Sequence, residues 1–337
     1  MKLSDRKLIL VLVAWLLLTS LACNLLTPKP AEQPAPKVPT PQLPTETVTP
    51  LPTSTQAPTS TATTIPSPTE EPPSPTPTVI HLFIPPASVE TGKLIPDVVS
   101  VDTATEKRAP YGDSYDINLF ERPFMQDMSY VPDLDIIGYS LSKDEKYYYV
   151  SIALVGSNPN NAIGIQYAVE LDLDADGFGD YIVVAYPPHS VEWSADNVQV
   201  AWDRDHDTSG LSPEKSDAPL PGNGYETVIF DGGRGPNDKD PDLAWARVNA
   251  GKNATVQFAF KRELAENRFM FGVLADAGPK NIGDLDYVDR FTKAEAGSPI
   301  GGDPNYPLKA LFGVDNTCRT AQGFEGNYEE PMRCPKK

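Results

Sequence analysis

A long tract of proline, threonine and serine limits which part of this chain can fold. From Thr27 to Thr78 these residues dominate, together with Ala and Gln, and short units such as Ser74-Pro75-Thr76-Pro77-Thr78 recur. The tract has almost no apolar surface to bury, so burial cannot offset the entropy lost on ordering. We therefore predict a disordered linker over residues 27–78, open to O-glycosylation, and a folded domain over residues 79–337.

The segment before the linker has the order of a secretory leader. An apolar run from Leu8 to Leu18 leads to the small residue Ala22, immediately before Cys23. The positive charges that precede the run are Lys2, Arg6 and Lys7. A charged start, an apolar core and a small residue at the end are typical of signal peptides.

A cysteine directly after the small residue resembles the lipobox of bacterial lipoproteins. The resemblance implies a signal peptide over residues 1–22 and a lipidated N-terminus over residues 23–26, with the acyl chains on Cys23. The chain departs from the usual pattern at Ser20 and Leu21, where that family has Leu followed by a small residue.

The alternative is an uncleaved membrane anchor. Leu8 to Leu26 contains only Asn24 as a strongly polar residue and approaches the ~20 apolar residues that span a bilayer. Both interpretations predict an extracytoplasmic, membrane-anchored domain, because the positive charges remain on the cytoplasmic side.

The charge of the chain restricts its partners. The formal net charge is -18 and the isoelectric point is about 4.5. The negative electrostatic potential of such a chain repels nucleic acid and anionic membrane surfaces, so we predict no nucleic-acid partner. Divalent cations are the natural counterpart.

The cysteines also fit export. Of three cysteines, Cys23 is assigned to the lipid, which leaves Cys318 and Cys334 as a pair in an oxidising compartment. We predict a disulfide between them, worth ~3 kcal/mol on the chain-entropy model. Two free thiols are the alternative.

Strand patterns dominate the folded part. Segments rich in β-branched and aromatic residues alternate with clusters of Gly, Pro, Asn and Ser, and the only helix predicted is short, Arg262 to Arg268. Many short strands with few helices indicate an all-β fold, an antiparallel two-sheet sandwich of jelly-roll or immunoglobulin-like type. The predicted strands are Ile80–Ile84, Asp133–Leu141, Tyr147–Val155, Ile165–Leu173, Tyr181–Tyr186, Val198–Trp202, Thr227–Phe230, Val256–Phe260 and Phe269–Leu274, with a further strand around Trp245.

One loop between two of these strands has the spacing of a calcium site. Counted from Asp172 as position 1, the loop has further aspartates at positions 3, 5 and 9, which are Asp174, Asp176 and Asp180. Gly177 stands at position 6. Hard oxygens from alternate residues converge on one cation, and glycine permits the sharp turn. No helices flank the loop, so we predict a calcium turn of the DxDxDGxxD type rather than an EF-hand. A solvated acidic hairpin is the alternative.

A second acidic segment supports a weaker prediction. Asp203, Asp205 and Asp207 repeat the alternate spacing but lack the following glycine. Neighbouring cations could neutralise these acids and those of the loop from Asn237 to Asp242. The candidates are Arg204, Lys239 and Arg247.

Signals for catalysis are weak. The three histidines have no zinc spacing and no nucleophile motif is present, so we predict a non-catalytic protein. A pair of glycosidase carboxylates is visible only in three dimensions, which leaves a glycan-active hydrolase as an alternative. Tyr147, Tyr148 and Tyr149 alternate across one strand, which predicts at least one ring turned away from the core, where it could stack on sugar.

Several segments together resemble a known group of domains. The run from Pro110 to Asp113, through Tyr130 to Asp135, to the calcium turn resembles the DOMON-like and family 9 carbohydrate-binding-module-like sandwiches, over roughly Val99 to Leu274. Asp240 to Arg247 and Val314 to Arg319 also resemble segments of bacterial surface proteins with such a domain. The resemblance implies a ligand-binding β-sandwich, often with structural calcium, and carries over no sugar-binding residue by position. We therefore predict a surface lipoprotein that binds extracellular carbohydrate or envelope polymer. The alternative is an adhesion or assembly module with a protein partner.

Overall fold

The computed structural model describes residues 79–110, 123–206, 208, 224–278, 281–284, 312–326 and 334. All of them belong to the second of two compact units, Pro73–Lys337. The predicted signal peptide, Cys23, the linker and Asp207 lie outside the described residues. Within the described residues, no helix is long and apolar enough to cross a membrane.

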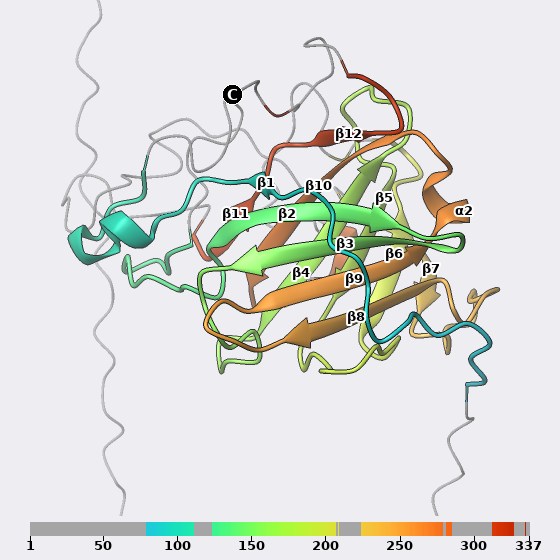
Figure 1. Cartoon of the computed structure of the whole chain (residues 1–337), viewed down its shortest axis with the longest axis horizontal. Helices are drawn as coiled ribbons and strands as arrows, with labels where there is room; N and C mark the ends of the chain where they lie inside the picture. The colour runs from blue at the N-terminus through green and yellow to red at the C-terminus, as the bar shows by residue number, and fades with distance from the viewer. Residues whose placement is uncertain are drawn as a thin grey trace, which may run out of the picture. The chain divides into compact units, whose positions relative to one another are not determined.

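The described residues fold mainly into strands (Figure 1). The strands are β1 (Ile95–Pro96), β2 (Ile136–Lys143), β3 (Tyr147–Leu154), β4 (Ile165–Asp172), β5 (Tyr181–Ala185), β6 (Val198–Trp202), β7 (Thr227–Asp231), β8 (Ala244–Asn249), β9 (Thr255–Lys261), β10 (Phe269–Ala277), β11 (Val314–Asn316) and β12 (Thr320–Gln322). The helical elements are the 3-10 turns η1 (Val101–Glu106) and η2 (Ile282–Asp284) and the α-helix α2 (Arg262–Ala265). The predicted helix therefore exists but is shorter than expected.

The strands form two antiparallel sheets packed against each other, which confirms the predicted all-β sandwich. One sheet has five strands in the order β1-β2-β3-β9-β8. The other has seven, with β11-β10-β4-β5-β6-β7 in order and β12 also paired with β10. Each described strand pair is antiparallel.

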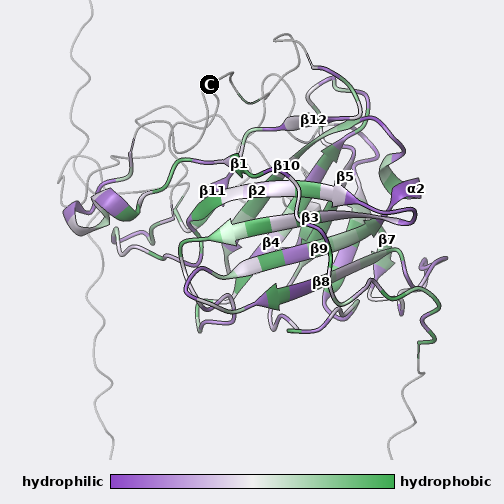
Figure 2. Cartoon of the chain, in the orientation of Figure 1, coloured by the Kyte–Doolittle hydropathy of each residue, from purple (hydrophilic) through white to green (hydrophobic). Residues whose placement is uncertain are grey.

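The main core lies between the sheets. Successive side chains of a strand point to opposite faces, so Val150 and Ile152 of β3 meet residues such as Tyr167 and Val169 of β4 in one buried cluster. Figure 2 shows hydrophobic and hydrophilic stretches following one another along the strands. Burial of each such large side chain stabilises the fold by ~1.5–3 kcal/mol.

The outer face of the seven-stranded sheet is also covered. Ala168, Ile182 and Val184 form a second buried cluster there with Tyr225 and Ile282 from outside the strands. As a result, all eight residues of β4 are buried. The carboxylates that β4 directs to this face are therefore held away from water.

A segment that we call the strap, residues 79–92, lies across the outer face of the five-stranded sheet. Figure 1 shows its blue trace crossing β3, β9 and β8 on the way to β1. The predicted strand Ile80–Ile84 is wrong, because this part of the strap joins no sheet. Its backbone donors at Leu82 and Phe83 instead bind the side-chain carboxylate of Asp242, both at 2.9 Å.

The strap also explains why no ring of the three tyrosines is exposed, although the predicted alternation holds. Tyr147 and Tyr149 do lie on the face of β3 opposite Tyr148, as alternation requires. All three are nevertheless buried, with exposures of 2%, 4% and 0% for Tyr147, Tyr149 and Tyr148. The Tyr147 hydroxyl donates to the Phe83 carbonyl of the strap, so the outer rings are not available as an open stacking surface.

Candidate metal centre and neighbouring pocket

Two acidic loops leave the same end of the seven-stranded sheet. Since β4, β5, β6 and β7 are consecutive antiparallel neighbours, the connection after β4 and the connection after β6 emerge side by side. The Gly179 amide donates to the Thr208 carbonyl at 3.1 Å, and the Asp203 amide donates to the Asp180 carbonyl at 3.0 Å. Acids far apart in sequence thus form one electronegative region.

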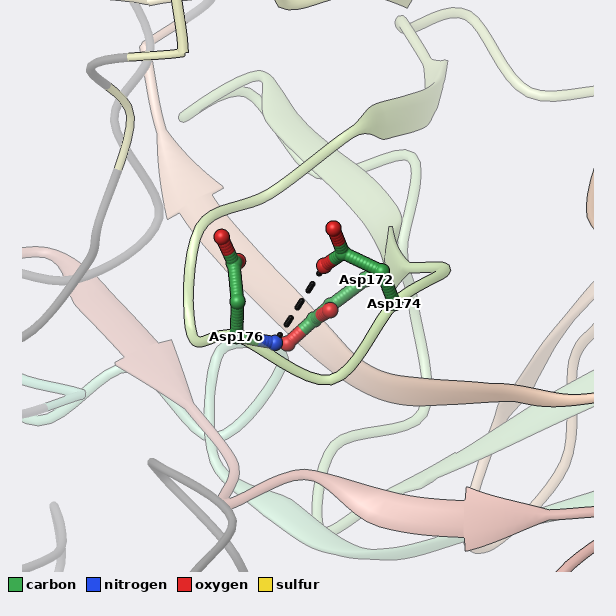
Figure 3. A group of neighbouring side chains, drawn as sticks. All are labelled: Asp172, Asp174 and Asp176. Carbon is green, nitrogen blue, oxygen red and sulfur yellow. Dashed lines mark hydrogen bonds between the residues drawn. The ribbon is translucent and has the colours of Figure 1, made fainter.

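The first loop brings together three of the four predicted ligands. Carboxylate oxygens of Asp172, Asp174 and Asp176 all lie within 4.8 Å of one another (Figure 3). Asp180 does not belong to this group, and its carboxylate accepts the Leu173 amide at 2.6 Å. It closes the base of the loop.

Asp172 organises the backbone of the first loop. Its carboxylate accepts the amides of Ala175 at 2.7 Å and Gly177 at 3.1 Å. Gly177 has a backbone φ of +100°, which residues other than glycine rarely adopt. This confirms the prediction that glycine permits the sharp turn of the loop.

A fully buried arginine neutralises the same carboxylate. Arg319 forms a two-pronged pair with Glu170, at 2.9 Å and 2.6 Å, and reaches Asp172 at 3.2 Å. It also donates to the Gly177 carbonyl at 2.8 Å, and Tyr225 donates to Glu170 at 2.8 Å. Burial raises the pKa of Asp172 to about 6, an effect that the Arg319 charge opposes and the Glu170 charge reinforces.

The predicted disulfide holds this arginine in place. Cys318 and Cys334 are bonded, with Cα atoms 4.9 Å apart, and the Cys334 amide donates to the Arg319 carbonyl at 2.8 Å. Sequence reasoning considered Arg204, Lys239 and Arg247 as counter-charges and missed Arg319. The only signal for Arg319 was its position next to a cysteine expected to be constrained.

The second loop repeats the geometry of the first. The Asp203 carboxylate accepts the backbone amides of His206 at 2.8 Å and Thr208 at 2.9 Å, which are the third and fifth residues after it. The Asp172 carboxylate likewise accepts the amides of the third and fifth residues after it, Ala175 and Gly177. His206 and the equivalent Ala175 both have φ +63°. The backbone of the weaker predicted site is therefore arranged like that of the stronger one.

The described part of the second loop brings together two of the three predicted ligands and adds one that was not predicted; the third, Asp207, lies outside the described residues. Asp203 and Asp205 lie within 4.8 Å of Glu226, which directly precedes β7. Burial is the main cause that raises the pKa of Glu226. Sequence spacing could not have identified Glu226, because only strand pairing brings it beside this loop.

A histidine links the two loops. The ring of His206 lies 2.8 Å from an Asp176 oxygen and its centroid is 4.5 Å from that of Phe178. The hydrogen bond with Asp176 is the main cause that raises the pKa of His206.

Both acidic groups are suited to a hard divalent cation. Calcium takes oxygen ligands at 2.3–2.6 Å, so ligands on opposite sides of one ion are separated by about 4.8 Å. A carboxylate has about four lone-pair sites, and the bonds to Ala175, Gly177 and Arg319 occupy three of those on Asp172. One site remains for a cation, and Asp174 and Asp176 are exposed to receive it.

A polar pocket of about 500 Å³ lies on the outer face of the five-stranded sheet. Its polar side chains are Glu192, Arg247, Asn249 and Gln257, and Ala87 of the strap forms one wall. Arg247 donates to Gln257 at 2.8 Å and to the Ala87 carbonyl at 2.7 Å, with its guanidinium 4.3 Å from the centre of the Trp193 ring. The sequence did not single out this group of residues, which come from four separate segments: the strap, the segment before β6, β8 and β9.

Comparison of the chain with protein-family models, curated proteins and solved structures found no match.

Proposed function

We propose that this protein is a non-catalytic surface lipoprotein whose calcium-stabilised sandwich binds neutral extracellular carbohydrate. The observation that carries the proposal is the polar pocket beside Trp193. Sugar hydroxyls both donate and accept hydrogen bonds, and this pocket combines a cationic donor, Arg247, an acceptor, Glu192, and the amides of Asn249 and Gln257. The net charge of -18 disfavours anionic polymers, which is why we propose a neutral glycan.

The calcium part of the proposal rests on the first acidic loop, with the second as a further site. Asp172, Asp174 and Asp176 supply oxygen ligands at the alternate spacing that calcium turns use. The resemblance to DOMON-like and family 9 carbohydrate-binding-module-like sandwiches agrees with both parts of the proposal. The cation would stabilise the loop end of the sheet and take no part in a reaction.

The location follows from the leader. We propose that the Cys23 thiol is acylated and becomes the N-terminus when residues 1–22 are removed, and that the linker carries the sandwich away from the membrane. In a bacterial host, a labelled fatty acid should be incorporated into wild type and not into Cys23→Ser. A wild-type protein that stays in the membrane fraction without the label would instead favour the uncleaved anchor.

Carbohydrate binding is tested by screening the purified protein, with calcium present, against a panel of neutral and anionic glycans. We expect a neutral glycan to bind, and Asn249→Ala or Glu192→Gln to weaken binding about tenfold, the loss expected for a hydrogen bond to ligand. The control is Glu145→Gln, an exposed acid in the turn between β2 and β3. Retention of no glycan by wild type would contradict the proposal, as would turnover of the bound sugar for its non-catalytic part.

A further inference from the structure

The strap is bound to the sheet chiefly through its backbone. Its amides at Leu82 and Phe83 share one carboxylate oxygen of Asp242, and the other oxygen accepts from the ring of His81 at 2.9 Å. Asp242 is only 1% exposed. A buried acid is thus committed to holding one end of an extended segment.

Side chains of the sheet and its loops donate to the strap's carbonyl groups. Tyr147 donates to Phe83, Trp193 donates to Pro86 at 2.9 Å, and Arg247 donates to Ala87 at 2.7 Å. Further along, Ser142 donates to Glu90. Recognition of four carbonyl groups in one extended segment depends on backbone shape more than on side-chain identity.

The donors lie along a row of aromatic rings. Centroids of Tyr147 and Tyr149 are 6.1 Å apart, and those of Tyr149 and Trp193 are 6.2 Å apart. Pro85, between the residues bound by Tyr147 and Trp193, is buried, whereas Ile84 and Pro86 on either side are exposed. We call Tyr147, Tyr149, Trp193, Asp242 and Arg247 the strap groove.

This chemistry favours proline in the bound segment. Proline has no backbone N–H, so Pro85 and Pro86 bring no donor that the groove would have to satisfy. Proline also favours the polyproline II conformation, which has no internal hydrogen bonds and leaves its carbonyl groups free to accept. Aromatic grooves with tyrosine and tryptophan donors are the usual partners of such peptides.

We propose that the strap groove is a binding site for proline-rich extended peptides, filled in the single molecule by its own strap and between molecules by the strap of a second copy. The second copy is the occupant because its residues 79–92 carry every group that the groove already recognises. Exchange of an identical segment needs no new contact. In dilute solution the attached strap has the higher effective concentration, so the exchange appears only where molecules are crowded. The proposal does not depend on carbohydrate binding.

The test uses the full chain and a fluorescent peptide with the sequence of residues 79–92. In wild type the attached strap should exclude the peptide. Pro85→Ser combined with Pro86→Ser in the chain should loosen the strap, seen as faster hydrogen exchange at Leu82 and Phe83, and the peptide should then bind. Adding Trp193→Phe should weaken that binding about tenfold, the loss expected for the part-buried hydrogen bond to Pro86. Adding Trp202→Phe, a 37% exposed ring on β6, should leave it unchanged.

Two results would overturn the site. Hydrogen exchange unchanged by the serine substitutions would mean that the groove does not recognise proline. A loosened strap without peptide binding would mean that the groove does not bind proline-rich segments between molecules. For the second-copy occupant, two differently tagged wild-type populations mixed at high concentration should co-purify. Absence of co-purification at any concentration would exclude strap exchange.

Discussion

The two acidic loops share one backbone geometry but are neutralised in different ways. In the first, Arg319 is fully buried against Asp172 and Glu170. In the second, Asp203 is also buried, at 2% exposure, but no buried arginine pairs with it among the residues that the structure describes. The first loop therefore has a built-in counter-charge, and we expect the second to depend more on a cation from solution.

The strongest test of this difference removes the built-in cation. Arg319→Met leaves Glu170 and Asp172 buried without compensation, and we expect it to lower the free energy of unfolding by about 3–5 kcal/mol. Chemical denaturation with and without calcium measures the loss. Calcium should restore part of it, because a bound ion would replace the missing charge near Asp172. A loss below about 1 kcal/mol would mean that Arg319 does not neutralise the loop.

The disulfide should affect the first loop next most strongly. Cys318→Ser opens a loop of sequence separation 16, for which the chain-entropy model predicts a loss of about 3 kcal/mol. Amide exchange should rise at Ala175 and Gly177, because Arg319 is no longer held beside them. Exchange at His206 should change less. Equal acceleration in both loops would contradict a link between the disulfide and the first loop.

Matched substitutions compare the two loops directly. Without calcium, Asp172→Asn should lower the free energy of unfolding by about 2 kcal/mol, because it weakens a hydrogen bond to a charged group. Asp203→Asn should cost about 1 kcal/mol, since it disturbs one backbone amide bond. Denaturation in a chelator measures both. The reverse order would show that the second loop is the more dependent on its first aspartate.

The smallest expected effect concerns the histidine that links the loops. The folded-state pKa of His206 is raised, so its contribution to stability is present below the unfolded pKa of about 6.5 and is lost as pH rises through the folded-state value. His206→Gln should flatten this part of the stability curve between about pH 6 and 8. Melting temperatures across that range provide the measurement. An unchanged curve would mean that the pair with Asp176 does not couple the loops.

Much of the fold was predictable because the strands carry their own pattern. In Thr255–Lys261, Val256, Phe258 and Phe260 face the core in strict alternation. The strands β1, β11 and β12 were missed because two or three residues carry no period. Ile80–Ile84 failed for a different reason. Its residues favour strands, but Asp242 satisfies the backbone donors that a neighbouring strand would have paired.

The candidate metal centre was predictable only where its ligands are local. Asp172, Asp174 and Asp176 share one loop, so their spacing revealed them. Glu226 and Arg319 reach the centre through strand pairing and a disulfide, and no local pattern records such contacts. The same limitation applies to the strap groove, whose donors come from β3, β8 and the segment before β6.

Calcium binding is the most direct test of the metal centre. Calorimetric titration and thermal melting should be performed on wild type, on Asp174→Ala with Asp176→Ala, and on Glu145→Gln as a charge control. We predict saturable binding and a raised melting temperature for wild type and the control, with both reduced in the double variant. Identical melting with and without calcium, and no heat of binding in wild type, would contradict a calcium-stabilised sandwich.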